Sequence, residues 1–132
     1  MPLGELREQC RKLPQLTVEC EGLLRFLQKR AATPSQLFSP EQLAGQIHID
    51  SELATALLMM ADNAGLVRPK YVSYCPEHDV AIHVADRLSG VPEWIDCPYH
   101  GTRHRRDELR TELQFELRHP EELLTLEALA TR

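Results

Sequence analysis

Residues 39–67 read SPEQLAGQIHIDSELATALLMMADNAGLV and contain the start and stop signals of two successive helices. Ser39 is followed by a proline and, three positions on, by Gln42, the pattern of a helix start with a reciprocal capping box. Asp50 is placed to cap the second helix, and Gly65 to end it in the left-handed conformation. This stretch therefore predicts two helices joined by a short turn.

Helical periodicity precedes this stretch, and an extended segment follows it. Apolar residues at a 3-4-3 spacing over 3–13 predict a short opening helix, which Pro14 ends. A second helix follows, with Thr17 as its expected N-cap and an apolar stripe at i, i+3, i+4 and i+7 made by Cys20, Leu23, Leu24 and Leu27. Residues 71–74 are expected to be extended, and 80–85 to form a strand because their apolar side chains are β-branched and alternate.

One short pattern occurs twice, as CPEH at 75–78 and as CPYH at 97–100. Each copy places a thiol and an imidazole on one tight turn, and the intervening residues 79–96 leave room for a small hairpin that brings the two turns together. Two sulfur and two nitrogen donors in a tetrahedron are what Zn²⁺ takes in closed structural sites. We therefore predict one structural zinc ion per chain, with the ligands Cys75, His78, Cys97 and His100.

Other cysteine and histidine residues leave alternatives open. His83 and His104 lie near the two turns and could each replace an assigned ligand, although neither has the paired spacing. Four cysteines would also suit disulfides in a secreted protein, but residues 1–12 lack the apolar core of a secretory signal. We therefore expect the cytoplasm, where metal binding is favoured over disulfides. Cys10 and Cys20 are interpreted as small buried hydrophobic residues.

The order of these elements resembles a winged helix-turn-helix domain over residues 17–75. The resemblance rests on SPEQLA at 39–44 and on NAGLV at 63–67, where MarR-like and related winged-helix families pass from the recognition helix into the wing. A winged helix that runs into a zinc ribbon is also similar in layout to the front half of the alpha subunit of general transcription factor IIE and its archaeal relative. The ribbons of those proteins use four cysteines.

The expected fold class is α+β and mostly helical, with a winged helix-turn-helix fused to a small zinc ribbon and a C-terminal helical tail. We expect a winged-helix domain with an N-terminal helix at 1–74, the zinc ribbon at 75–101 and an amphipathic helical tail at 102–132. The tail is predicted from leucines four positions apart at 109, 113 and 117 and from a second apolar set at 123–129. No apolar stretch is long enough to span a membrane.

Charge bears on the choice between a protein partner and nucleic acid. The candidate recognition helix at 51–63 contains no lysine or arginine, and Met59 and Met60 make its outer face apolar. We therefore predict contacts to a protein partner, or self-association, through Met59, Met60, Leu123 and Leu126. Nucleic acid is disfavoured also because 75–101 holds five acidic residues against one basic residue, Arg87. The residues that would bind nucleic acid are Arg68, Lys70, Arg103, Arg105 and Arg106.

Enzyme activity is not expected, and neither is a small-molecule substrate. The sequence contains no zinc-protease, deaminase, serine-hydrolase or phosphate-binding motif, and the two paired turns would close the metal shell. The function expected from the sequence is a non-enzymatic zinc-binding winged-helix adaptor that mediates protein–protein contacts in a cytoplasmic complex. The alternative is a DNA-binding transcriptional regulator of winged-helix type.

Overall fold

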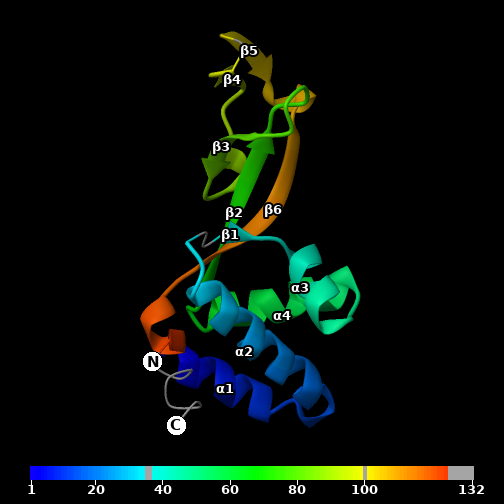
Figure 1. Ribbon diagram of the computed structural model, residues 1–132, viewed down its shortest axis with the longest axis vertical. Helices are drawn as coiled ribbons and strands as arrows, with labels where there is room; N and C mark the ends of the chain where they lie inside the picture. The colour runs from blue at the N-terminus through cyan, green and yellow to red at the C-terminus, as the bar shows by residue number, and fades with distance from the viewer. Residues whose placement is uncertain (35–36, 100, 125–132) are drawn as a thin grey trace. The chain divides into compact units, whose positions relative to one another are not determined.

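A computed structural model of the chain describes residues 1–34, 37–99 and 101–124 (Figure 1). The chain forms two compact units. Unit 1 consists of Met1–Arg68 together with Phe115–Arg132, and unit 2 consists of Pro69–Gln114. Unit 2 is thus an insertion, in sequence, between two parts of unit 1.

Unit 1 is mainly helical. Its elements in chain order are α1 (Pro2–Arg11), the 3₁₀ turn η1 (Pro14–Leu16), α2 (Thr17–Ala31), β1 (Leu37–Phe38), α3 (Pro40–Ile47) and α4 (Ser51–Asn63). Helix α1 packs against α2 and α4, and α3 packs against both α2 and α4 (Figure 1). Each of these four helices therefore has two helical neighbours, against which it buries its apolar stripe.

The predicted helix boundaries around 39–67 are confirmed. The Ser39 hydroxyl accepts a hydrogen bond from the Gln42 amide at 3.2 Å, and the Gln42 side chain accepts one from the Ser39 amide at 2.8 Å. Asp50 accepts from the Leu53 amide at 2.7 Å, and Gly65 follows α4 with a φ of +88°. These local bonds satisfy the free amides at each helix start, which explains why the sequence signals were sufficient.

Thr17 does not cap α2, contrary to the prediction. Leu16 occupies the N-cap position without a side-chain hydrogen bond, and Thr17 is the first helical residue. Its hydroxyl donates to the Pro14 carbonyl at 2.8 Å instead. The 3₁₀ turn η1 runs directly into α2, and this continuity removes the extended residue that a capping side chain needs.

Aromatic residues hold the centre of unit 1 together. The ring of Phe38 on β1 lies edge-on to Phe26 of α2, with ring centres 5.2 Å apart, and stacks on Phe115 at 6.4 Å. Phe38 and Phe115 are fully buried. These contacts join residues that are far apart in the sequence, and they pack two paired strand residues against helix α2.

The larger sheet has the strand order β1-β6-β2-β3, where β2 is Val67–Tyr74, β3 is Ala81–Ala85 and β6 is Arg110–Leu117. Strand β1 pairs antiparallel with the end of β6, with Phe38 opposite Phe115. Strand β2 pairs antiparallel with β3, with Val72 opposite Val84. The predicted strand at 80–85 is therefore confirmed. Strands β2 and β6 each begin in one unit and end in the other, so they form the covalent links between the units.

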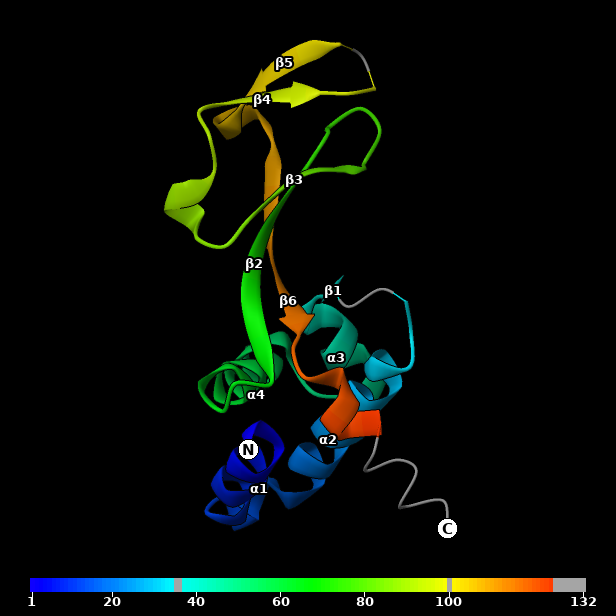
Figure 2. The ribbon, with the colours of Figure 1, turned by 90° about the vertical axis from the view of Figure 1, so that its left-hand side faces the viewer.

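Unit 2 is built from strands and turns around a small core. After β3 come η2 (Leu88–Gly90), β4 (Trp94–Cys97), β5 (Thr102–Arg105) and η3 (Arg106–Glu108), with β4 and β5 forming a separate antiparallel hairpin (Figure 2). One cluster of buried apolar residues consists of Ala85, Val91, Ile95 and Leu109, with Tyr71 and Ile82 packed against it. Val72 on β2 is buried as well. This hairpin carries part of the candidate site.

The prediction of a helical tail from residue 102 is wrong for much of its length. Residues 102–105 and 110–117 are the strands β5 and β6, and among the described residues of this segment α-helix occurs only at 120–124. Leu113, Phe115 and Leu117 also alternate, and in the folded chain this alternation is satisfied by pairing with β1 and β2. Non-local pairing therefore prevails over a local i+4 pattern. An α+β fold is confirmed.

No helix within the described ranges is both long enough and apolar enough to cross a membrane.

Candidate metal centre

The first paired turn is a tight loop at the end of β2. The Cys75 amide donates to the Val80 carbonyl at 2.9 Å, and the Asp79 amide donates to the Cys75 carbonyl at 2.8 Å. Asp79 adopts a left-handed conformation with a φ of 52°, which an aspartate tolerates better than most residues. The loop thereby folds His78 back towards Cys75, and the Sγ of Cys75 lies 3.7 Å from Nδ1 of His78.

The second paired turn lies between β4 and β5. The Gly101 amide donates to the Cys97 carbonyl at 3.0 Å, and Gly101 has a φ of 67°, the conformation that glycine adopts without strain. Strand β4 alternates between exposed and buried side chains, with Ile95 and Cys97 facing inward. This alternation directs the Cys97 thiol to the buried side of the hairpin.

The hairpin register places a third donor beside the two thiols. His104 on β5 lies directly opposite Ile95, so its side chain shares the inward face with Ile95 and Cys97. The donor atoms of Cys75, Cys97 and His104 all lie within 4.8 Å of one another. The structure thus brings together two thiols and an imidazole from three different strands or strand ends.

The spacing of the thiols fits a shared metal ion and not a disulfide. The two sulfur atoms of Cys75 and Cys97 are 3.7 Å apart. A disulfide would need about 2.05 Å. A tetrahedron with metal–sulfur bonds of about 2.3 Å has a sulfur–sulfur edge of roughly 3.8 Å, so the observed separation matches that of two ligands on one ion. Both cysteines are buried.

The surroundings of Cys75 favour its thiolate form. Burial raises the pKa of the Cys75 thiol, but hydrogen bonds from the His78 side chain, from the backbone at Glu77 and His78, and with Cys97 more than offset this, so that the pKa falls to about 7. A thiolate is the form that binds a metal ion. The local hydrogen bonds therefore prepare the donor before any ion arrives.

Two of the four predicted ligands, Cys75 and Cys97, lie together with His104, which was predicted only as a substitute. The third, His78, lies beside Cys75. His100 lies outside the described residues. His104 could not be singled out from spacing, because its position depends on the β4–β5 register. His83 lies on β3 opposite Ser73, and its buried Nδ1 has no hydrogen-bond partner among the described residues.

An ion pair supports the first turn from outside. Arg110 at the start of β6 binds the Asp79 carboxylate at 2.6 Å, and its guanidinium lies over the Tyr74 ring at 4.7 Å from the ring centre. Tyr74 and Asp79 flank the turn that carries Cys75 and His78. Arg110 thus connects β6 to the loop that presents two of the donors.

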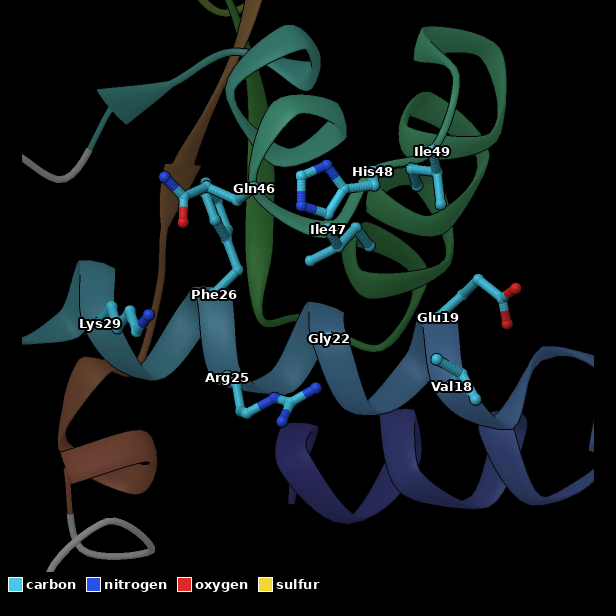
Figure 3. A pocket seen from close by; sticks show the side chains of 10 residues that line it. All are labelled: Val18, Glu19, Gly22, Arg25, Phe26, Lys29, Gln46, Ile47, His48 and Ile49. Atoms are coloured by element: carbon cyan, nitrogen blue, oxygen red, sulfur yellow. The ribbon is translucent and has the colours of Figure 1, made fainter.

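One further cluster of polar side chains and one cavity lie outside this site, and neither resembles a metal centre to the same degree. His119, Glu121 and Glu122 lie close together near the end of the described chain, but His119 pairs with Glu121 at 3.3 Å and the group is largely exposed. A cavity of about 510 Å³ lies between α2 and residues 46–49 at the end of α3, and Figure 3 shows its lining. Its lining mixes apolar groups with Glu19, Arg25 and Lys29 and includes no cysteine.

Close approach of the backbones shapes this cavity. Gly22 of α2 faces Ile47, and a Cβ atom on Gly22 would lie only 2.9 Å from Cγ2 of that isoleucine. Real side chains do not approach so closely, so the glycine allows α2 and α3 to pack at this point.

The predicted partner-binding residues differ in exposure. Met59 on α4 is 42% exposed, and Met60 is half-buried. Leu123 is fully buried within the chain, so its side chain is not available to a partner, and this conflicts with its predicted role. Leu126 lies outside the described residues. The apolar face of the terminal segment packs on its own chain at Leu123, as amphipathic segments usually do.

The predicted nucleic-acid residues are largely engaged locally. Lys70 pairs with Asp86, Arg103 with Asp96 at 3.1 Å, and Arg105 with Asp107 at 3.7 Å. The Arg105 guanidinium also lies over the Trp94 ring, 5.7 Å from its centre. Arg106 donates to the Val91 carbonyl at 3.2 Å, and Arg68 is exposed.

Comparison of the chain with protein-family models, with curated proteins and with solved structures finds no match.

Proposed function

We propose that this chain is a non-enzymatic, zinc-binding adaptor of winged-helix type that works through protein–protein contacts in a cytoplasmic complex. In this proposal, unit 1 presents the contact surface and the metal maintains the fold of unit 2. The observation that carries the proposal is the character of α4, which has no lysine or arginine and exposes Met59.

The winged-helix interpretation is supported by element order. The chain follows a helix, strand, helix, helix, strand order from α2 to β2, and β6 then lies between β1 and β2 in the sheet. This agrees with a winged helix in which the wing connects β2 to β6. Unit 2 would then be an elaboration of the wing, since its residues stand between those two strands in sequence.

The zinc assignment is supported by the donor set. Two thiols 3.7 Å apart with imidazoles beside them favour Zn²⁺ over Mg²⁺ or Ca²⁺, which prefer oxygen ligands. We assign Cys75, Cys97 and His104 to the ion, with His78 or His100 completing a tetrahedron. Four protein ligands would leave no position for a reacting water, so the ion would be structural.

A protein partner is favoured over DNA by the chemistry of α4. Sequence reading by a recognition helix needs arginine, lysine, asparagine or glutamine side chains aimed at base edges. Residues 51–63 have no lysine or arginine, and Glu52 and Asp62 would repel phosphate. Exposed methionine is instead common on adaptable protein-binding surfaces because its side chain is flexible and polarisable.

The experiment uses affinity capture of the tagged full chain from nuclease-treated extract. Met59→Glu should abolish capture of a defined partner, or self-association seen by light scattering, while the zinc content stays unchanged. The matched control is Val18→Glu on α2, because Val18 is also apolar and is 72% exposed. Equal capture by the Met59→Glu, Val18→Glu and unmodified chains would refute the role of α4.

DNA binding remains the second candidate because Arg68 is exposed at the start of β2, the strand that follows α4. A gel-shift series at increasing salt distinguishes it. Tight, salt-sensitive binding to a defined duplex that is lost in Arg68→Glu would favour this candidate and overturn the adaptor proposal.

A further inference from the structure

We propose that Cys10 and Cys20 form a redox modification site, a dithiol that a hydroperoxide converts into a disulfide within the chain. Neither residue belongs to the metal centre. From sequence alone both were interpreted as buried hydrophobic residues, and the fold gives them a different relation.

The fold brings the two cysteines together at one cavity. Cys10 lies in the last turn of α1, Cys20 lies in the first part of α2, and the turn η1 reverses the chain between them. The two helices pack against each other (Figure 1). Both cysteines line the same cavity of about 420 Å³, and Arg7 lines it too. A chain reversal of this kind places residues on successive helices side by side.

Cys10 and Cys20 are free cysteines, and both line the same cavity between the packed helices α1 and α2. By contrast, Cys75 and Cys97 keep a separation of 3.7 Å, which suits two ligands on one ion. The chain therefore holds two cysteine pairs in different surroundings, and we assign direct bonding to the Cys10–Cys20 pair.

Access distinguishes the two thiols. Cys20 is only 3% exposed, whereas Cys10 is half-buried. A small oxidant that enters the cavity reaches Cys10 first. Arg7, three positions before Cys10 on α1, lines the same cavity.

The reaction has two balanced steps. The Cys10 thiol attacks one oxygen of hydrogen peroxide, the O–O bond breaks, and Cys10 becomes a sulfenic acid while one water leaves. The Cys20 thiol then attacks the Cys10 sulfur, the S–OH bond breaks, and a second water leaves as the disulfide forms. Each sulfur loses one electron, and the peroxide gains two. In a reducing compartment, such a bond is transient and returns to two thiols by exchange.

The test treats the zinc-loaded full chain with hydrogen peroxide and maps its tryptic peptides without reduction. Cleavage after lysine and arginine puts each cysteine on its own peptide, at 8–11, 13–25, 71–87 and 88–103. We expect peptides 8–11 and 13–25 to become joined, with a loss of about two hydrogen masses and full recovery on reduction.

Two variants establish which cysteine reacts first. In Cys20→Ala the sulfenic acid on Cys10 cannot be resolved, so a dimedone adduct should accumulate on peptide 8–11. In Cys10→Ala, peptide 13–25 should stay unmodified under the same treatment. Mapping of the unmodified chain decides the proposal even if a variant fails to fold. Two free thiols after oxidation, or a bond from either cysteine to a second chain, to Cys75 or to Cys97, would overturn it.

Discussion

The two units of this chain are stabilised in different ways. Unit 1 buries large apolar side chains, among them Phe38, Leu58 and Phe115, which are at most marginally accessible to solvent. Unit 2 has a core of Ala85, Val91, Ile95 and Leu109, and its other buried groups include the two thiols of the candidate metal centre. The first unit can fold on hydrophobic burial, whereas the second needs a further source of stability.

Size explains the difference. A segment confined to 69–114 falls in the range where burial of a single core supplies only about 3–5 kcal/mol. Small domains of this kind use disulfides or a structural metal to offset the conformational entropy of folding. Surface ion pairs such as Asp79 with Arg110 add little, about 0–1 kcal/mol each. The comparison therefore predicts that unit 2 depends on metal and that unit 1 does not.

The largest expected effect comes from removing a sulfur ligand. Cys75→Ser should reduce the metal content from one ion per chain to none and unfold unit 2, because structural zinc sites contribute apparent free energies of about 10–16 kcal/mol. Metal content is measured by atomic emission on the purified chain, and folding by amide resonances from 69–114.

The matched control is Cys10→Ala, which replaces a cysteine of unit 1. Its metal content should equal that of the unmodified chain. A Cys75→Ser protein that retains one ion and the unit 2 resonances would contradict the assignment of Cys75.

A smaller effect is expected from a cavity in the core of unit 1. Leu58 is fully buried on α4, and Leu58→Ala should lower the free energy of unfolding of unit 1 by about 2–5 kcal/mol. The measurement is urea denaturation followed by helical circular dichroism. The zinc content of the folded protein should not change. If the helical signal and the metal were lost at the same urea concentration, the two units would not differ in the source of their stability.

The smallest effect is expected at the close approach of α2 and α3. In Gly22→Ala the new Cβ would meet Ile47 at 2.9 Å, so the helices must separate slightly, at a cost of about 1–3 kcal/mol. The double variant Gly22→Ala with Ile47→Ala should recover part of this loss. A thermal melt distinguishes the cases, and a Gly22→Ala chain as stable as the unmodified chain would remove the packing argument.

The sequence predicts local features well and non-local features poorly. The capping box at Ser39, the cap at Asp50 and the glycine end of α4 depend on residues within four positions, and all are confirmed. Leu113 and Leu117 fit a helix equally well by spacing, but β6 forms because it pairs with β1 and β2. Local periodicity holds no information about such partners.

The candidate site shows the same division. The turn that joins Cys75 to His78 is a local feature, and its spacing was enough to predict that they lie together. His104 approaches the thiols only because β5 pairs with β4 in a register that puts it opposite Ile95. The register is fixed by the whole hairpin, so spacing along the chain could name His104 only as an alternative.

We expect a metal ion to maintain the fold of unit 2, and unit 1 to fold without it. Hydrogen exchange of the full chain, with and without a strong zinc chelator, tests this most directly. Chelation should remove amide protection in peptides from 69–114, and added zinc should restore it. Protection in 1–34 and 40–63 should stay unchanged. Equal protection of 69–114 with and without the chelator, in protein shown to have lost its metal, would contradict this expectation.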